Sequence, residues 1–131
     1  MKDSLGIGSA VREILSSDAA VAVPTGGCIY PLVAEENATF PFITYGILDV
    51  HPKTTKDGHY AFGDEAEVGI SILAESYEEC VDLSIAVRHA MVSFSGDTDD
   101  YDISSISFTG ASDDYNDGAY FRNMVFMIDI E

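Results

Sequence analysis

The stretch Ile-Tyr-Pro-Leu at residues 29–32, followed after a short acidic loop by Phe-Pro-Phe-Ile-Thr-Tyr at residues 40–45, is the most informative part of the chain. It predicts a short strand at about Cys28–Tyr30, a turn, and a second strand over Phe42–Leu48 that is entered through a proline. Because Pro31 cannot donate a ladder hydrogen bond, the first strand is expected at a sheet edge or a strand end.

Hydrophobic spacing predicts the elements on either side of this pair. Apolar residues with a period of 3.6 predict a first helix over Ser4–Ser16, which ends before the breaker at Pro24–Gly27. The unpatterned stretch Asp49–Asp64 predicts a long loop that is mobile and lies outside the core. The later elements are a strand at Ala66–Ala74, a helix at Ser76–Phe94, and strands at Ile103–Thr109 and Tyr120–Ile130.

These elements predict one α+β domain over residues 1–131, in which two helices pack on one face of a mostly antiparallel sheet. The last two strands are expected to be antiparallel neighbours, connected near Asp113–Asp117. The second helix has a main apolar stripe and also a second stripe made by Val81, Ile85 and Val92. A helix on a sheet needs only one stripe, so we expect the first helix or another subunit to cover at least two of these three residues.

The chain has 131 residues, 47% of them hydrophobic, and a formal net charge of −17 at pH 7. This composition is typical of a globular protein, and no apolar run reaches the roughly 20 residues of a membrane span, so a soluble intracellular protein is expected. The scattered basic residues and the net charge disfavour binding to nucleic-acid phosphates, including sequence-specific recognition. The acidity would serve solubility through self-repulsion, or it would form an acidic wall past which DNA slides.

The sequence indicates no catalytic, cofactor or metal site. Counting from Asp97, the acidic turn has Asp102 where an EF-hand needs glycine and Phe108 where it needs glutamate. The histidines, His51, His59 and His89, lack the spacing of zinc ligands, and Cys28 and Cys80 add no close pair. Both cysteines are expected to be reduced, and no nucleophile elbow or phosphate-binding glycine loop is present.

The order of these features resembles the phage tail-completion, or tail-terminator, proteins of the head–tail joint. The matching segments are the opening helix, residues 26–32, 40–45, 68–72 and 76–80, and the ending at residues 120–126. The resemblance implies a structural, non-enzymatic protein encoded by a phage or prophage. It also implies a ring, commonly a hexamer, that caps the tail tube and joins the tail to the head connector. Its partners would be further copies of itself, the tail-tube protein and the connector proteins, first in the host cytoplasm and then in the virion tail.

Within such a ring, the candidate contact residues are the second helix stripe, two lysines and one acidic turn. They are Val81, Ile85, Val92, Lys53, Lys56, Asp113, Asp114 and Asp117. The three aspartates would form a negative rim, or they would belong to a solvated turn without a partner. The alternative is a small intracellular α+β enzyme or ligand-binding domain, which a convergent pocket with a perturbed carboxylate or histidine would favour.

Overall fold

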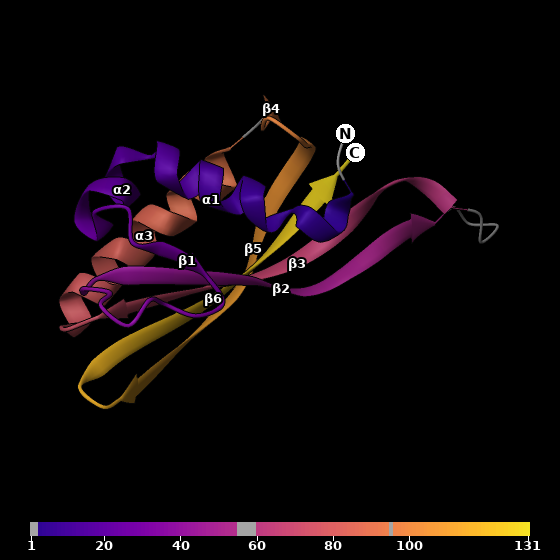
Figure 1. The fold of residues 1–131 in the computed structure, drawn as a ribbon. Helices are drawn as coiled ribbons and strands as arrows, with labels where there is room; N and C mark the ends of the chain where they lie inside the picture. Colours follow the sequence, from indigo (N-terminus) through magenta and orange to yellow (C-terminus); the bar gives the residue numbers. More distant parts are fainter. Residues whose placement is uncertain (1–2, 55–59, 95) are drawn as a thin grey trace.

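The computed structural model describes residues 3–54, 60–94 and 96–131 (Figure 1). The chain begins with a 3-10 helix, η1 (Ser4–Gly6), and continues through α1 (Gly8–Ser17), α2 (Ala19–Thr25), β1 (Ile29–Pro31), β2 (Phe42–Thr54), β3 (Tyr60–Ala74), α3 (Tyr77–Ser93), β4 (Gly96–Asp97), β5 (Asp102–Asn116) and β6 (Ala119–Ile130).

The strands of the described residues form one six-stranded sheet in the order β1-β2-β3-β6-β5-β4. The predicted α+β class is confirmed, but the prediction of a mostly antiparallel sheet is wrong. The sheet is mixed, because β1 pairs with β2 in parallel, with Ile29 opposite Ile43. After β1, Leu32 adopts a left-handed backbone with φ of 63°, and the chain then returns to enter β2 in the same direction as β1.

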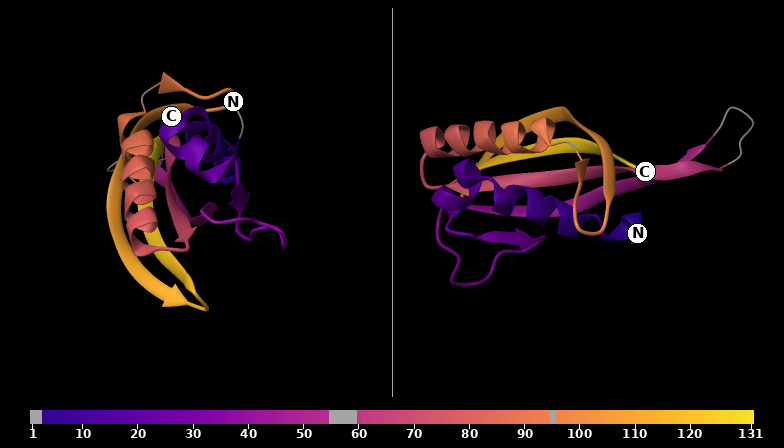
Figure 2. Two further views of the ribbon diagram at one scale, coloured as in Figure 1. Left: turned by 90° about the vertical axis from the view of Figure 1, so that its left-hand side faces the viewer. Right: turned by 90° about the horizontal axis from the view of Figure 1, so that it is seen from above.

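The sheet curls into a half-barrel, and the helices lie on its concave side (Figure 2). Helix α3 lies along β3, β5 and β6, and α1 lies along β1 and β2. The predicted apolar stripe of α3 is buried in the core, at Cys80, Leu83, Val87, Ala90 and Met91. It packs against the alternating inward side chains of β3 and β6, such as Ile70 and Phe126, which are fully buried.

The sequence predicts two helices, whereas the described residues form three α-helices and η1. The extra one, α2, lies in the segment that the sequence predicts as a connection. Asp18 restarts the helix, because its carboxylate accepts a hydrogen bond from the backbone N–H of Ala20 at 3.0 Å. Gly26 ends it in a left-handed conformation, with φ of 61°, so the break comes after Pro24.

The predicted loop at Asp49–Asp64 is wrong over most of its length. Strand β2 continues to Thr54, β3 begins at Tyr60, and Val50 pairs with Ala66 and His51 with Glu65. Residues 55–59 lie outside the described part of the chain, so the predicted mobility of the segment stays untested there. This arm extends beyond the helices (Figure 1), and a strand with little core to face has no reason to alternate apolar with polar residues.

The antiparallel pairing of the last two strands is confirmed, but their connection is shorter than predicted. Strand β5 continues through the acidic segment to Asn116, which pairs with Ala119. Asp117 and Gly118 make the turn, with φ of 53° and 79°. Positive φ at both central residues is typical of a two-residue hairpin turn, so Asp113 and Asp114 belong to a strand.

Candidate functional site

The predicted second stripe of α3 is only partly brought together at the surface. Val81 is half-buried, whereas the side chains of Ile85 and Val92 are 62% and 45% exposed. Ile85 and Val92 line a shallow hollow of about 330 Å³ with Arg88 and His89. We name these four residues the α3 patch. Helix α1 does not cover Ile85 and Val92 in the single chain, and their contact with another subunit stays a prediction.

Arg88 connects the α3 patch to strand β5 on the helix-covered face of the sheet. Its guanidinium carbon lies 4.4 Å from the centre of the Phe108 ring on β5, a cation–π contact. Among the ion pairs of the described residues, none includes Arg88. The patch therefore presents a positive charge beside apolar side chains on a strongly acidic protein.

Of the two lysines predicted as contact residues, the structure describes only Lys53. Lys53 is on β2, where its ammonium group pairs with the carboxylate of Asp129 on β6. The Lys53 side chain is only 24% exposed, so it is a strand residue and not a free cation in a loop. Lys56 and His59 lie outside the described residues. His51 on β2 lies 3.3 Å from the carboxylate of Asp49.

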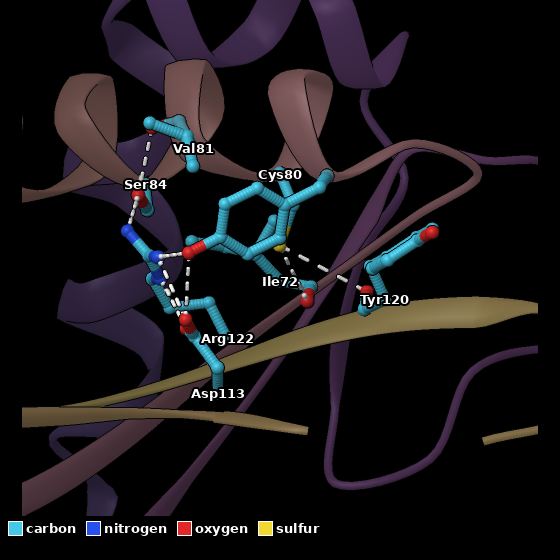
Figure 3. Close-up of polar contacts among 8 residues, drawn as sticks. Ile72, Cys80, Val81, Ser84, Asp113, Tyr120 and Arg122 are labelled. Atoms are coloured by element: carbon cyan, nitrogen blue, oxygen red, sulfur yellow. Dashed lines mark hydrogen bonds and ion pairs between the residues drawn. The ribbon is translucent and has the colours of Figure 1, made fainter. Parts of the chain in front are cut away.

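The predicted acidic rim contains an ion pair that the sequence analysis missed. Arg122 on β6 donates two hydrogen bonds to Asp113 on β5, at 2.6 and 3.1 Å (Figure 3). It also donates to the hydroxyl oxygens of Ser84 at 3.1 Å and Tyr77 at 3.0 Å, both on α3. We name Asp113, Arg122, Tyr77 and Ser84 the hairpin clamp, because it fastens α3 to the β5–β6 hairpin.

Charge and hydrogen bonding in the hairpin clamp shift two pKa values in opposite directions. The hydrogen bonds from Arg122 and Tyr77 hold the pKa of Asp113 below its ordinary value. The hydrogen bond that Tyr77 donates to Asp113 raises the pKa of the Tyr77 phenol. Since the Arg122 guanidinium is already occupied by a bidentate carboxylate, the clamp is suited to holding the hairpin and not to binding an anion.

The Asp113–Arg122 pair of the hairpin clamp could have been predicted from the register of the hairpin. In a two-residue hairpin, residues at equal distance from the turn face each other, and Asp113 and Arg122 lie symmetrically about Asp117–Gly118. The other two predicted rim residues, Asp114 and Asp117, are exposed. The structure thus divides the predicted rim into one neutralised and two solvated aspartates.

Both cysteines are free thiols. Cys80 lies beside the hairpin clamp, with its sulfur 3.8 Å from the carbonyl oxygen of Ile72 and 3.9 Å from that of Tyr120. Burial raises the pKa of the Cys80 thiol. It is therefore a packed side chain and not an activated nucleophile.

An acidic corner forms where α1 meets the β4 segment. Partial removal from water, together with a hydrogen bond and repulsion from Asp99, raises the pKa of Glu13. Both carboxylates line a hollow of about 480 Å³ with Ser17 and Ser93. The two serine hydroxyls donate to backbone carbonyls of their own helices, so neither is an activated nucleophile. Within the described residues, no group of three or more histidines, cysteines or carboxylates could hold a metal ion.

A second apolar surface lies at the β2 edge of the sheet and was not predicted. Its most exposed members are Leu5, Leu32, Val33 and Leu48, between 57% and 78% exposed. With Ile47 we name them the β2-edge patch. Leu5, Leu32 and Ile47 line a hollow of about 850 Å³ that also holds Arg12 and Glu13. The signal in the sequence is the pair Leu32-Val33, which directly follows the strand-ending Pro31.

Comparison with known proteins gives a family and a fold. The family model described as "Tail completion protein gp17" matches residues 9–130. A chain of the solved structure "Virion of native gene transfer agent (GTA) particle" is similar in fold, with a TM-score of 0.79 and 19% identity over 99% of both chains. No significant match was found among curated proteins. None of the helices in the described residues is long and apolar enough to span a membrane.

Proposed function

The chain belongs to the tail completion protein gp17 family, and from that premise we propose that it forms a ring that caps the phage tail tube and joins the tail to the head connector. The family match over residues 9–130 carries this proposal, because it includes α1, α3 and both long hairpins. Membership of this family makes the chain a structural phage tail protein. Copies of the chain, the tail-tube protein and the connector proteins are the proposed partners.

The shape of the molecule supports a role in assembly. Both long hairpins extend beyond the helices, in different directions (Figure 1). The β2–β3 arm carries Lys53, and the β5–β6 arm carries the exposed carboxylates of Asp114 and Asp117. Arms of this kind reach surfaces that a compact core cannot, and exposed apolar side chains such as Ile85 and Val92 on α3 fit a protein contact.

The proposed contact residues follow from this arrangement. Ile85 and Val92, together with the half-buried Val81, are proposed to meet another subunit. Lys53, on the β2–β3 arm, is proposed to face the tube or the connector, and Lys56, outside the described residues, is proposed to share that contact. Asp114 and Asp117 form a negative tip, which repels DNA phosphates or pairs with a basic partner; Asp113 contributes less because Arg122 neutralises it.

The alternative of a small α+β enzyme or ligand-binding domain has weaker support. The carboxylate pair Glu13 and Asp99 is its best feature, because the pKa of Glu13 is raised. Its hollow contains neither a histidine nor a basic residue among the lining side chains. A carboxylate pair without a nucleophile or a proton-transfer partner supplies no complete reaction.

Deletion of the gene from the encoding phage or prophage tests the proposal. The particles would be examined by electron microscopy, with and without the wild-type protein supplied from a plasmid. The proposal predicts unjoined heads and tails of uncontrolled length in the deletion, and normal particles after complementation. Normal joined particles in the deletion alone would contradict it.

A further inference from the structure

Most of the exposed large apolar side chains of the described residues, Val23 on α2 being an exception, gather at two opposite sides of the sheet. On the β1–β2 side they are Leu5, Leu32, Val33, Phe40, Ile47 and Leu48. On the α3–β5 side they are Tyr77, Ile85, Val92 and Tyr115. Figure 2, in the view from above, shows α3 and β5 on one side of the molecule and β1 with its following loop on the other. The two apolar surfaces are therefore different and face apart.

The conformation of Leu32 indicates that the exposed apolar side chains of the β2-edge patch have a role. It holds a φ of 63°, a conformation that bulky residues rarely adopt, and its side chain is 74% exposed. Its backbone N–H donates to the carbonyl of Tyr45 at 2.8 Å, which fixes this conformation. A strained backbone that presents leucine to water indicates a surface built for contact.

Both sides of the sheet also leave backbone groups unpaired. Among the described residues, β4 pairs with β5 only at Asp102 and Ile103, and β1 pairs with β2 only at residues 43–45. The outer edges of β5 after Ile103 and of β2 after Tyr45 are therefore open over most of their length. Open edges of this kind readily accept another chain.

Charge favours contact between the two unlike surfaces over contact between like ones. The α3 patch contains Arg88 and His89 beside its apolar side chains. The β2-edge patch is bordered by two carboxylates, since Glu13 lines the same hollow and Asp49 follows Leu48 directly. One cation, Arg12, also lines this hollow, and it donates a hydrogen bond to the carbonyl oxygen of Ile29 at 3.4 Å. In a chain with a net charge of −17, copies repel each other unless opposite charges meet locally.

We propose that the α3 patch of one copy binds the β2-edge patch of the next copy, head to tail. The inference rests on the proposed function, and it names the interface by which the ring would form. Two different surfaces on one chain make a heterologous contact, which produces a closed ring when the rotation between neighbours closes. Ile85 and Val92 meet the surface around Leu32 and Leu48, and Arg88 meets the carboxylates at its border.

Two single variants and their mixture test this interface. Ile85→Glu disrupts only the α3 patch, and Leu32→Glu disrupts only the β2-edge patch. Val23→Glu is the matched control, because Val23 is 77% exposed on α2 and belongs to neither patch. Masses are measured by sedimentation up to about 1 mM protein, which detects even a Kd of about 1 mM. The buffer contains about 0.5 M salt, which screens the general repulsion.

The wild type and Val23→Glu are expected to form species larger than a dimer. Each disruptive variant alone is expected to stay monomeric, with association weakened roughly tenfold or more, because a glutamate would be buried without a partner. An equimolar mixture of the two is expected to form dimers and nothing larger, since each supplies one intact and unlike patch. A contact between identical patches cannot produce monomers for each variant alone together with dimers in their mixture.

Several results would overturn the interface: a wild type that stays monomeric at every concentration, variants that assemble like the wild type, or a mixture that gives no dimer. These outcomes are separable from failure of the proposed function. A monomeric wild type that still restores normal particles to the deletion refutes this interface alone. Head-to-tail assembly in solution, together with normal particles in the deletion, refutes the tail-capping role alone.

Discussion

Asp113→Asn is expected to destabilise the fold, whereas the same change at its neighbour, Asp114→Asn, is not. Asp113 accepts two hydrogen bonds from Arg122 and one from Tyr77. Asp114 is exposed, and the oxygen that accepts a hydrogen bond from the backbone N–H of Tyr115 survives in asparagine. The two variants lose the same charge from an acidic protein, so the difference between them isolates the ion pair with Arg122.

The expected difference in the free energy of unfolding is about 1 kcal/mol at pH 7. Exposed ion pairs contribute roughly 0.2–1 kcal/mol, and bidentate guanidinium–carboxylate pairs lie at the upper end. The Asp113 side chain is 44% exposed and that of Arg122 is 19% exposed, so we assign no more than the upper end. In a domain of this size, the difference corresponds to about 3–5 °C in Tm.

The difference also depends on pH with a defined sign. The pKa of Asp113 is lowered in the folded state, so its contribution is present above the ordinary aspartate pKa of about 4. It is lost as the pH falls through the lower folded value and the carboxyl becomes protonated. Thermal denaturation of both variants from pH 7 down to pH 2 measures this. Equal Tm values at pH 7, or a gap that persists undiminished at pH 2, would refute the reasoning.

Three further outcomes are expected from buried side chains. Tyr101→Phe should lower the free energy of unfolding, measured by urea titration, by about 1 kcal/mol, because the Tyr101 hydroxyl donates a hydrogen bond to the backbone carbonyl of Asp3 at 2.9 Å and the residue is buried. The control is Tyr115→Phe, at a position 58% exposed, which should leave the free energy of unfolding unchanged. Phe126→Ala should cost about 3–5 kcal/mol in the same titration, since the ring is fully buried, and a loss below 1 kcal/mol would contradict its central place in the core. The buried Cys80 thiol should resist Ellman's reagent at pH 8 until the protein unfolds, while the half-buried Cys28 thiol reacts first. Equal reaction rates of the two thiols in the native state would show that Cys80 is accessible.

The sequence predicts the core elements of this fold because their burial imposes a period. The helix predicted at Ser76–Phe94 matches α3 to within one residue at each end, and the strand predicted at Ala66–Ala74 forms the later part of β3, which begins at Tyr60. Apolar residues alternate along the strand and recur at helical spacing along the helix, because one face of each element packs against the core. The family resemblance, drawn from the order of these elements, agrees with the family match.

The parts of the fold that were not predicted lack that periodic signal. The arm formed by the ends of β2 and β3 and the tip of β5 extends beyond the helices, so its residues alternate little. Helix α2 is short and depends on one cap, Asp18, while Pro24 in its last turn indicates a break. The parallel pairing of β1 depends on the unusual backbone of Leu32, which no propensity favours.

The contact role predicted for the surplus apolar stripe of α3 stays a prediction, and the ion pairs that depend on strand pairing were not predicted. Ile85 and Val92 were predicted as a surplus stripe, and they are exposed. The Asp113–Arg122 pair and the Lys53–Asp129 pair depend on strand register, which the sequence analysis did not assign at these positions. The β2-edge patch combines η1, the segment after β1, and β2, which only the fold brings together.

The position of the protein in the assembled particle tests the central proposal most directly. A tagged, complementing copy would be located by electron microscopy with gold labelling of intact particles and of isolated tails. The proposal predicts label only at the head-proximal end of the tail, between the tube and the connector. Label along the tube, label at the opposite end, or particles without label would contradict it.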